Sequence, residues 1–137
     1  MNHFRRLENI YVSAPVNQYY KPEIRIDKGL CTILQTVNPE SFHAANALHG
    51  SVLFKLLDDA AFFAANSAVE NRFVLTGSFN IKFHKPISSG IIKAKGVLVK
   101  HEGRKLWAKS DVKSEDDELL ASGDGIFIVS SILLDDL

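Results

Sequence analysis

The stretch from His49 to Ala68, HGSVLFKLLDDAAFFAANSA, constrains the fold more than any other part of the chain. At about 100° per residue, one sector about 100° wide holds Ser51, Lys55, Asp58, Asp59, Phe62 and Asn66, and Val, Leu, Phe and Ala occupy nearly all the rest. A helix that is apolar around most of its circumference must be enclosed. The charged residues interrupt the apolar run, which falls short of the roughly 18 unbroken residues of a membrane span. We therefore predict a central helix with a curved sheet packed around it.

The composition indicates one domain of ordinary globular type. A chain of 137 residues can bury a core of its own, so residues 1–137 are expected to form a single domain. The formal net charge of zero argues against nucleic acid or an anionic membrane as the main partner. The single cysteine, Cys31, excludes an internal disulfide and a thiolate zinc cage. Because the N-terminal residues contain no apolar run of signal-peptide length, a cytoplasmic protein is expected.

Hydrophobic periodicity predicts an α+β architecture in which an antiparallel sheet of five or six strands curls around the central helix. Residues 1–20 carry apolar side chains at helical spacing before Pro15, which indicates a short docking helix and then a linker. Residues 38–48 lack periodicity and are expected to form a loop. The predicted strand regions are 23–37, with a tight turn at Asp27-Lys28-Gly29, and then 73–83, 91–100, 105–112 and 119–131.

Two strand regions carry further detail. Strict alternation in residues 73–83 assigns Leu75 and Phe79 to the apolar face, and Thr76 to the polar face. In the last strand, Gly123 and Gly125 suggest a bulge or a close backbone approach.

Two residues of the central helix are candidates for chemistry. Gly50 lies at the helix start, where free N–H groups at a positive helix end would bind a carbonyl or an oxyanion, although the glycine could simply permit a tight entry. Asp58 has phenylalanines at i−4 and i+4, and partial desolvation would raise its pKa and suit it to general-base or nucleophilic work. The alternative is an ion pair between Asp58 and Lys55. Asp59, four residues after Lys55, is itself expected to pair with that lysine.

His43 and His49 bracket Asn46 in the loop before the helix. Their spacing matches no standard metal site, so neither a metal nor a cofactor is expected. His49 is interpreted as a structural residue that ties the loop to backbone carbonyls. Glycine-rich phosphate loops and nucleophile elbows are absent from the sequence, which argues against NTP chemistry and a serine triad.

The segments HGSVLFKLLDDAAFFAANS, TGSFNIKFHKPISSG and GRKLWAKSDV resemble the hotdog-fold acyl-CoA thioesterases of the PaaI-like clade, in the 4-hydroxybenzoyl-CoA thioesterase superfamily. The resemblance covers about residues 29–129. The family signature is a His-Gly-Gly before the central helix and an acid nine positions after that histidine, which correspond here to His49-Gly50 and Asp58. Ser51 replaces the second glycine and keeps its N–H. The resemblance implies a hotdog fold and thioesterase activity.

The resemblance also implies roles for residues around the helix. His43 stands where the family usually has an Asn or Gln that positions the thioester or the water, so it could hold the water or donate to the carbonyl. Asn46 occupies a position that is usually glycine. Thr76 falls where relatives carry a Ser or Thr hydroxyl that faces the site. The sites of the family lie at a dimer interface.

Helix geometry leads to the same dimer. Gly50 and Asp58 are eight residues apart, about 12 Å along one helix, which is too far for both to act on one carbonyl. Two copies with antiparallel helices would place Gly50 of one opposite Asp58 of the other in a C2 homodimer. Gly50 would then stabilise the oxyanion while Asp58 activates water or attacks directly. A dimer of dimers is expected.

The predicted substrate is a small or medium acyl- or aryl-CoA thioester. Its expected binding residues are Asn46, Ser51, Phe62, Lys85, Arg104 and Lys105, and the three basic residues among them are candidates for the phosphates or plain surface charges. A non-catalytic acyl-CoA sensor on the same fold remains the alternative, because His43 and Ser51 depart from the signature. A hotdog dehydratase or hydratase is disfavoured, since the sequence holds no Asp and His pair in the context of those enzymes.

Overall fold

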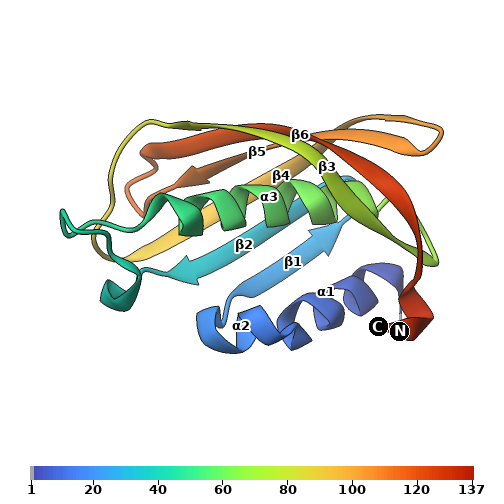
Figure 1. The fold of residues 1–137 in the computed structure, drawn as a ribbon, viewed down its shortest axis with the longest axis horizontal. Helices are drawn as coiled ribbons and strands as arrows, with labels where there is room; N and C mark the ends of the chain where they lie inside the picture. The colour runs from blue at the N-terminus through green and yellow to red at the C-terminus, as the bar shows by residue number, and fades with distance from the viewer. Residues whose placement is uncertain (1) are drawn as a thin grey trace.

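A computed structural model describes residues 2–137. Three α-helices, six β-strands and two short 3-10 helices follow one another in the order shown in Figure 1. The helices are α1 His3–Ser13, α2 Pro15–Tyr20 and α3 Gly50–Asn66, and the 3-10 helices are η1 Pro39–Ser41 and η2 Leu134–Asp136. The strands are β1 Glu23–Asp27, β2 Leu30–Thr36, β3 Arg72–Phe83, β4 Ile91–Glu102, β5 Lys105–Lys113 and β6 Leu119–Leu133.

The six strands form one antiparallel sheet in the order β1-β2-β4-β5-β6-β3. The sheet curls around α3, as Figure 1 shows, so the predicted architecture is confirmed and the strand count is six. The predicted tight turn joins β1 to β2, and Gly29 takes the left-handed conformation that this turn requires (φ +70°). The strand that follows α3, β3, pairs with β6 and so lies at one edge of the sheet.

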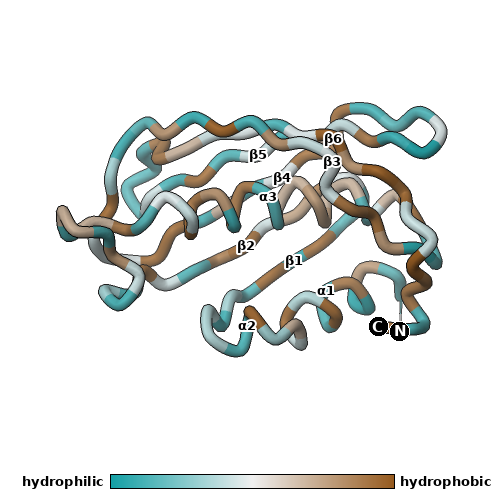
Figure 2. The backbone as a smooth tube through the Cα atoms, in the orientation of Figure 1, coloured by the Kyte–Doolittle hydropathy of each residue, from teal (hydrophilic) through white to brown (hydrophobic). Residues whose placement is uncertain are grey.

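The core lies between α3 and the concave face of the sheet. Leu56, Leu57, Ala60 and Ala64 of α3 are fully buried there, against inward-facing residues such as Ile33. Figure 2 shows hydrophobic residues recurring along α3 and the strands around it. The expectation that this helix is enclosed by protein is therefore confirmed. Among the described residues, no helix is long and apolar enough to cross a membrane.

Glycines allow the closest approaches within this core. A Cβ at Gly96 of β4 would lie 2.1 Å from the carbonyl oxygen of Ala60, so a side chain there would drive α3 away from the sheet. Gly123 and Gly125 of β6 accommodate the ring of Phe79, whose atoms would lie 2.5 Å from a Cβ at either position. The register is regular at both glycines, so of the predicted bulge or close backbone approach the structure has the approach: backbone oxygens of Asn80 and Ser78 would lie 2.9 Å from the added Cβ atoms, and the Phe79 ring would lie closer still.

A shift in register between Thr76 and Ser78 breaks the alternation of β3. Before this irregularity, which contains Gly77, the Thr76 hydroxyl points to α3 and Leu75 is 46% exposed. The assignment of Leu75 to the same face as Phe79 is therefore wrong. The bulge adds one residue to the strand and reverses which side chains face the helix.

The N-terminal segment departs from prediction at residues 15–20, which were expected to be a linker. Pro15 instead begins α2, since proline is favoured in the first turn of a helix. The preceding helix, α1, docks on the core through the buried side chains of Leu7 and Tyr11. His3 Nε2 also donates to the carbonyl oxygen of Asn66, 2.9 Å away, at the end of α3.

Asn66 ends α3 two residues before the predicted end at Ala68. Asn66 falls in the polar sector of the predicted helix, and its side chain is fully buried. The side-chain amide donates to the carbonyl oxygens of Val69 and Arg72 at 3.1 and 3.0 Å, and accepts the Val74 N–H at 2.9 Å. A buried amide with all these partners is stable because its polar atoms remain satisfied.

Candidate functional site

Asp58 lies in the middle of α3, on the side that faces β3. It is half-buried, and its neighbours one turn away on α3 pack against aromatic rings. The ring of Phe54 lies 5.6 Å from that of Phe79, and the ring of Phe62 lies 4.9 Å from that of Phe73. The predicted aromatic surroundings of this carboxyl are thus present, and both neighbouring strand residues come from β3.

The Asp58 carboxyl is tied to β3 by a single hydrogen bond. Thr76 Oγ1 donates to Asp58 Oδ1 at 2.9 Å. Burial raises the pKa of Asp58 from 3.8 to about 6, and the nearby Asp59 carboxylate adds to this shift, while the Thr76 hydrogen bond and the Lys55 charge oppose it. A carboxyl with a pKa near 6 is ionised at neutral pH and still basic enough to accept a proton from water.

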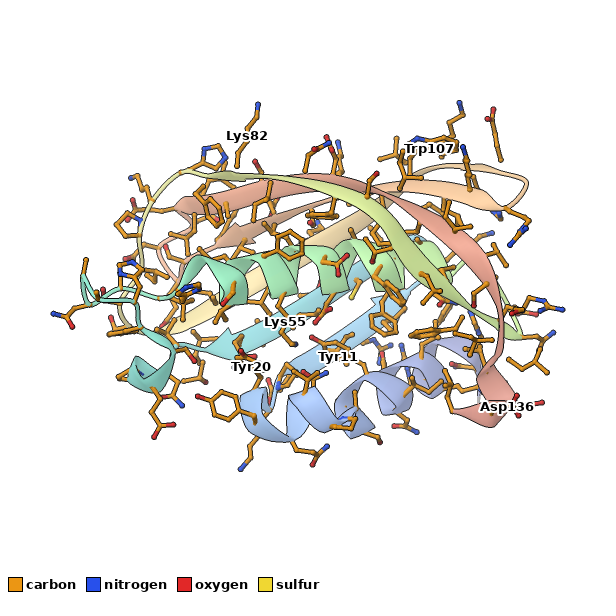
Figure 3. All side chains as sticks on the ribbon, in the orientation of Figure 1. Tyr11, Tyr20, Lys55, Lys82, Trp107 and Asp136 are labelled. Atoms are coloured by element: carbon orange, nitrogen blue, oxygen red, sulfur yellow. The ribbon has the colours of Figure 1, made fainter. Side chains whose placement is uncertain are left out.

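Lys55 pairs with Asp59 rather than with Asp58. Its ammonium lies 2.8 Å from Asp59 Oδ2, and it also donates to Asn17 Oδ1 at 2.8 Å and to the Tyr11 hydroxyl at 3.2 Å. Tyr11 in turn donates to Asp59 at 2.7 Å. Figure 3 shows Lys55 pointing from α3 toward Tyr11 and Tyr20. The ion pair expected for Asp59 is confirmed, and within residues 2–137 Asp58 forms no ion pair, although the Lys55 charge acts on it from a distance.

The start of α3 presents one free amide. His49 is the N-cap: its ring Nδ1 accepts the Ser51 N–H at 3.0 Å and lies 2.8 Å from the Ser51 hydroxyl. The ring therefore accepts a backbone N–H, and the predicted tie to a backbone carbonyl is made by the His49 N–H, which donates to Ser41 O at 2.9 Å. Within residues 2–137, the Gly50 N–H has no hydrogen-bond acceptor.

Phe83 covers the other side of this helix start. A Cβ at Gly50 would meet its ring at 3.1 Å, although Phe83 itself is 57% exposed. Glycine at position 50 thus allows an aromatic side chain from the end of β3 to lie against the helix. The predicted alternatives for Gly50, a binding amide or a tight approach, are compatible with each other here.

The polar groups of the loop before α3 form hydrogen bonds within the loop and with Ser88. His43 is exposed, and its Nδ1 accepts the Ala45 N–H at 3.0 Å. Asn46 has a left-handed backbone (φ +64°), which agrees with glycine being usual at this position, and its carbonyl oxygen accepts the Ser88 hydroxyl at 3.0 Å. No contact joins His43 or Asn46 to Asp58 among the residues described.

The basic residues considered for coenzyme A are divided between two ends of the molecule. Lys85 follows β3 and forms an ion pair with Glu118. Arg104 and Lys105 lie at the β4–β5 turn, at the opposite end from the start of α3 in Figure 1, and the Arg104 guanidinium donates to Val129 O at 3.0 Å. One protomer therefore does not gather these three cations at one site. Nor does the described part of the chain hold a cluster of three metal-binding side chains.

The outer edge of β3 is an unpaired sheet edge twelve residues long. Large apolar side chains are exposed along it and on α3 beside it: Leu75 (46%), Phe83 (57%) and Phe54 (39%). Unpaired edges with exposed apolar side chains pair readily with another strand. Sequence patterns do not reveal this edge, because they cannot tell which strand lacks a neighbour.

Together these parts form two half-sites on one protomer: a free amide at the start of α3 and a basic carboxyl two turns further along. An unpaired amide at a positive helix end stabilises a developing oxyanion, and a half-buried carboxylate removes a proton from water. The pair is suited to the addition of water to a carbonyl, provided that a second copy brings them together.

Solved structures of several proteins share this fold. PaaI from the phenylacetic acid degradation operon of Escherichia coli superposes with a TM-score of 0.86 at 18% identity, over 94% of both chains. The thioesterase HI1161 of Haemophilus influenzae gives 0.83 at 17% identity, over 95% of this chain and 92% of that one. The TT0310 protein of Thermus thermophilus gives 0.77 at 20% identity, over 84% and 97%. The fold of this chain is therefore the hotdog fold.

The family of this chain is assigned from its sequence rather than from its fold. The comparison with curated proteins found no match. The model of the thioesterase superfamily matches residues 45–121, which run from the loop before α3 into β6 and include both half-sites. Since this segment makes up more than half of the chain, the protein belongs to the thioesterase superfamily, with the hotdog fold.

Proposed function

We propose that this protein is an acyl-CoA thioesterase that hydrolyses a small or medium acyl- or aryl-CoA thioester to the free acid and coenzyme A. One observation carries the proposal: the half-buried Asp58 carboxyl, bound by Thr76 and with a pKa of about 6, lies beside an unpaired sheet edge. Membership of the thioesterase superfamily supports hydrolase chemistry. The proposed enzyme is a cytoplasmic homodimer that assembles further into a dimer of dimers.

The edge of β3 supports a specific dimer. Antiparallel pairing of two β3 strands about a two-fold axis would cover Leu75 and Phe83 and would run the two α3 helices antiparallel on the same face of a continuous sheet. Such pairing places the start of one α3 beside the middle of the other. Each site would then combine the Gly50 N–H of one subunit with Asp58 of the partner subunit.

The reaction follows from these two groups. The thioester carbonyl accepts the Gly50 N–H, and the positive end of α3 stabilises the oxyanion that forms. Asp58 accepts a proton from water while the water oxygen bonds to the carbonyl carbon; the tetrahedral intermediate then expels the coenzyme A thiolate, which takes up the proton. Direct attack by Asp58, giving an anhydride that water hydrolyses, is the other route open to the same carboxylate. Thr76 holds the carboxylate in place in both routes.

A pair of variants tests the sharing of the site. Gly50→Pro removes the N–H and keeps the helix, because proline is favoured at the first helical position and His49 already has the extended backbone that precedes proline (φ −61°, ψ 138°). Its Cβ would lie 3.1 Å from the exposed Phe83 ring, so Gly50→Ala, which adds the same Cβ and keeps the N–H, is its control. Loss of one oxyanion donor is expected to lower kcat by about 10²–10³-fold. Asp58→Asn removes the base. Each variant alone is expected to be inactive toward a panel of acyl-CoAs.

Mixing the two variants gives the decisive result. After unfolding and refolding together, about half of the dimers are mixed, and each mixed dimer contains one intact and one doubly defective site, so about a quarter of wild-type turnover returns. A site contained within one protomer would give no recovery. Full turnover by Asp58→Asn alone would remove this residue from the mechanism.

A non-catalytic acyl-CoA sensor is the second candidate. It is favoured by His43, whose Nδ1 is bound to the Ala45 N–H within its own loop, so that this nitrogen is not available at the position where relatives use Asn or Gln. A sensor would bind acyl-CoA tightly without turnover, and Asp58→Asn would leave the dissociation constant unchanged. Equilibrium binding measured beside the turnover assay separates the two functions.

A further inference from the structure

A groove of about 350 Å³ lies between α2, the loop before α3 and the first turn of α3. Its floor is the buried side chain of Val52, and its walls are the half-buried rings of Tyr20 and Phe42. The rim consists of Tyr19, Glu40, Ser41, His49 and Ser51. This volume falls at the lower end of the range of small-molecule sites. The groove lies at the start of α3, about two helical turns before Asp58.

The tyrosine wall is held in place from behind. The Lys55 ammonium lies 5.0 Å from the centre of the Tyr20 ring and is itself fixed by Asp59 and Asn17, each at 2.8 Å. The Tyr20 carbonyl oxygen accepts the Gln35 side-chain N–H at 2.7 Å, which ties the end of α2 to β2. A wall with this support is already formed before a ligand arrives, which reduces the entropy lost on binding.

The charge of the groove restricts its occupant. Glu40 is the acid on the rim, and no lysine or arginine of residues 2–137 lines the groove. A phosphate or a free carboxylate would be repelled there, whereas an uncharged apolar group would pack against the two rings and Val52.

We propose that this groove is the acyl subsite, in which the acyl group of the thioester lies between Tyr20 and Phe42. This inference rests on the proposed function, because it takes the thioester carbonyl to be bound at the Gly50 N–H. Ser51, the next residue, stands on the rim, so one arm of such a thioester enters the groove directly. The coenzyme A arm carries phosphates, for which the groove offers no lysine or arginine and only the carboxylate of Glu40, so the lining favours the acyl arm as its occupant. The length of the groove then sets the acyl length that the enzyme prefers.

An acyl-CoA series from acetyl to octanoyl tests the subsite. In the wild type, kcat/KM is expected to rise about fourfold for each methylene that the groove covers. Ser41→Phe fills the groove, since Ser41 lines it and its hydroxyl makes no hydrogen bond in the described structure. We expect the ratio of kcat/KM for hexanoyl-CoA over acetyl-CoA to fall at least about tenfold in this variant. Thr32→Phe, which adds the same ring to the far side of β2, is the control and should keep the wild-type ratio.

A second variant covers the case in which Ser41→Phe fails to fold. Phe42→Ala removes one wall, and the gain in kcat/KM per methylene should become smaller, with thermal unfolding used to confirm a folded protein. If either folded variant weakens all acyl-CoAs and free coenzyme A by one common factor, the groove holds the pantetheine arm and the inference is wrong. An unchanged length profile in both variants overturns it as well.

Failure of the inference and failure of the proposed function give different results. If the protein proves to have no turnover, dissociation constants of the same acyl-CoA series report on the groove alone. Length-dependent affinity that is lost in Ser41→Phe would support the subsite even in a sensor. If the protein has turnover and Ser41→Phe does not change its dependence on acyl length, the proposed thioesterase function is retained and the acyl subsite is refuted.

Discussion

Replacing Asp58 with asparagine is expected to abolish turnover and to make the fold more stable at neutral pH. The folded carboxyl has a pKa raised from 3.8 to about 6, so between these values the native state binds the proton more tightly than the unfolded state does. Its contribution to stability is therefore full at low pH and is lost as the pH rises through 6. Asparagine has the shape of the protonated acid and still accepts the Thr76 hydroxyl, but it never carries the buried charge.

The size of the effect follows from the shift. The change from 3.8 to about 6 corresponds to about 3 kcal/mol at full burial. Because the side chain is partly exposed, solvent screening reduces this to about 1–2 kcal/mol. We expect Asp58→Asn to gain this much free energy of unfolding at pH 7.5 and to gain almost nothing at pH 4, where the native carboxyl is already protonated. Urea unfolding at the two pH values measures both quantities.

The same carboxyl sets the pH dependence of turnover. If Asp58 is the base, kcat/KM falls on the acid side with an apparent pKa near 6, and below this pH it drops about tenfold per pH unit. Release of free thiol from an acyl-CoA follows the reaction.

Asp59→Asn is the matched control, since this neighbouring acid is paired with Lys55 and bound by Tyr11. It should lose about 1–3 kcal/mol of stability and keep turnover with an acid limb, and this limb should move to lower pH because the Asp59 charge no longer raises the pKa of Asp58. Equal stability of wild type and Asp58→Asn at pH 7.5, or turnover by that variant, would refute the reasoning.

Three further predictions concern residues around the site. Thr76→Val removes the hydrogen bond that lowers the pKa of Asp58, so the acid limb of kcat/KM should move to higher pH, whereas Thr76→Ser should restore the wild-type profile; identical profiles for all three proteins would contradict this role. Gly96→Ala should lose at least about 3 kcal/mol of unfolding free energy, because its Cβ would lie 2.1 Å from the Ala60 carbonyl oxygen, and a wild-type melting temperature would show that α3 can move away freely. Leu75→Glu places like charges across the proposed two-fold axis and should give a monomer without turnover in light scattering and activity assays, and an active monomer would rule out the shared site.

The fold was predictable from sequence where the signal is local. The nearly continuous apolar surface of residues 49–68 required an enclosing layer, and the alternation of the later strands supplied the sheet. Prediction failed where one extra residue reverses the alternation of side chains along a strand, and where contacts distant in sequence determine whether a residue is buried. The bulge at Gly77 turns Thr76 inward and Leu75 outward, which strict alternation cannot show. Asn66 has the sequence position of a surface residue but is buried by partners that follow α3.

The candidate site divides in the same way. Gly50 and Asp58 could be singled out from the helix itself, and the structure gives Asp58 the aromatic neighbours and the raised pKa that its position suggested. The groove beside Tyr20 could not be found, because its walls come from segments that are brought together only by the fold. Arg104 and Lys105 looked suitable as isolated charges, yet the topology carries them to the far end of the protomer.

The bulge in β3 also affects the register in which the β3 strands of two subunits would pair. A slip of two residues between the paired strands displaces one chain along the other by about 7 Å. This displacement is more than twice the length of a hydrogen bond, so the Gly50 N–H and the Asp58 carboxyl could no longer both contact one thioester. Gly50 and Asp58 lie on one rigid helix in each subunit. The register between the two paired strands therefore sets the distance between Gly50 of one subunit and Asp58 of the other. An insertion or deletion next to Gly77 would therefore change this register and abolish hydrolysis while leaving every side chain of the site unchanged.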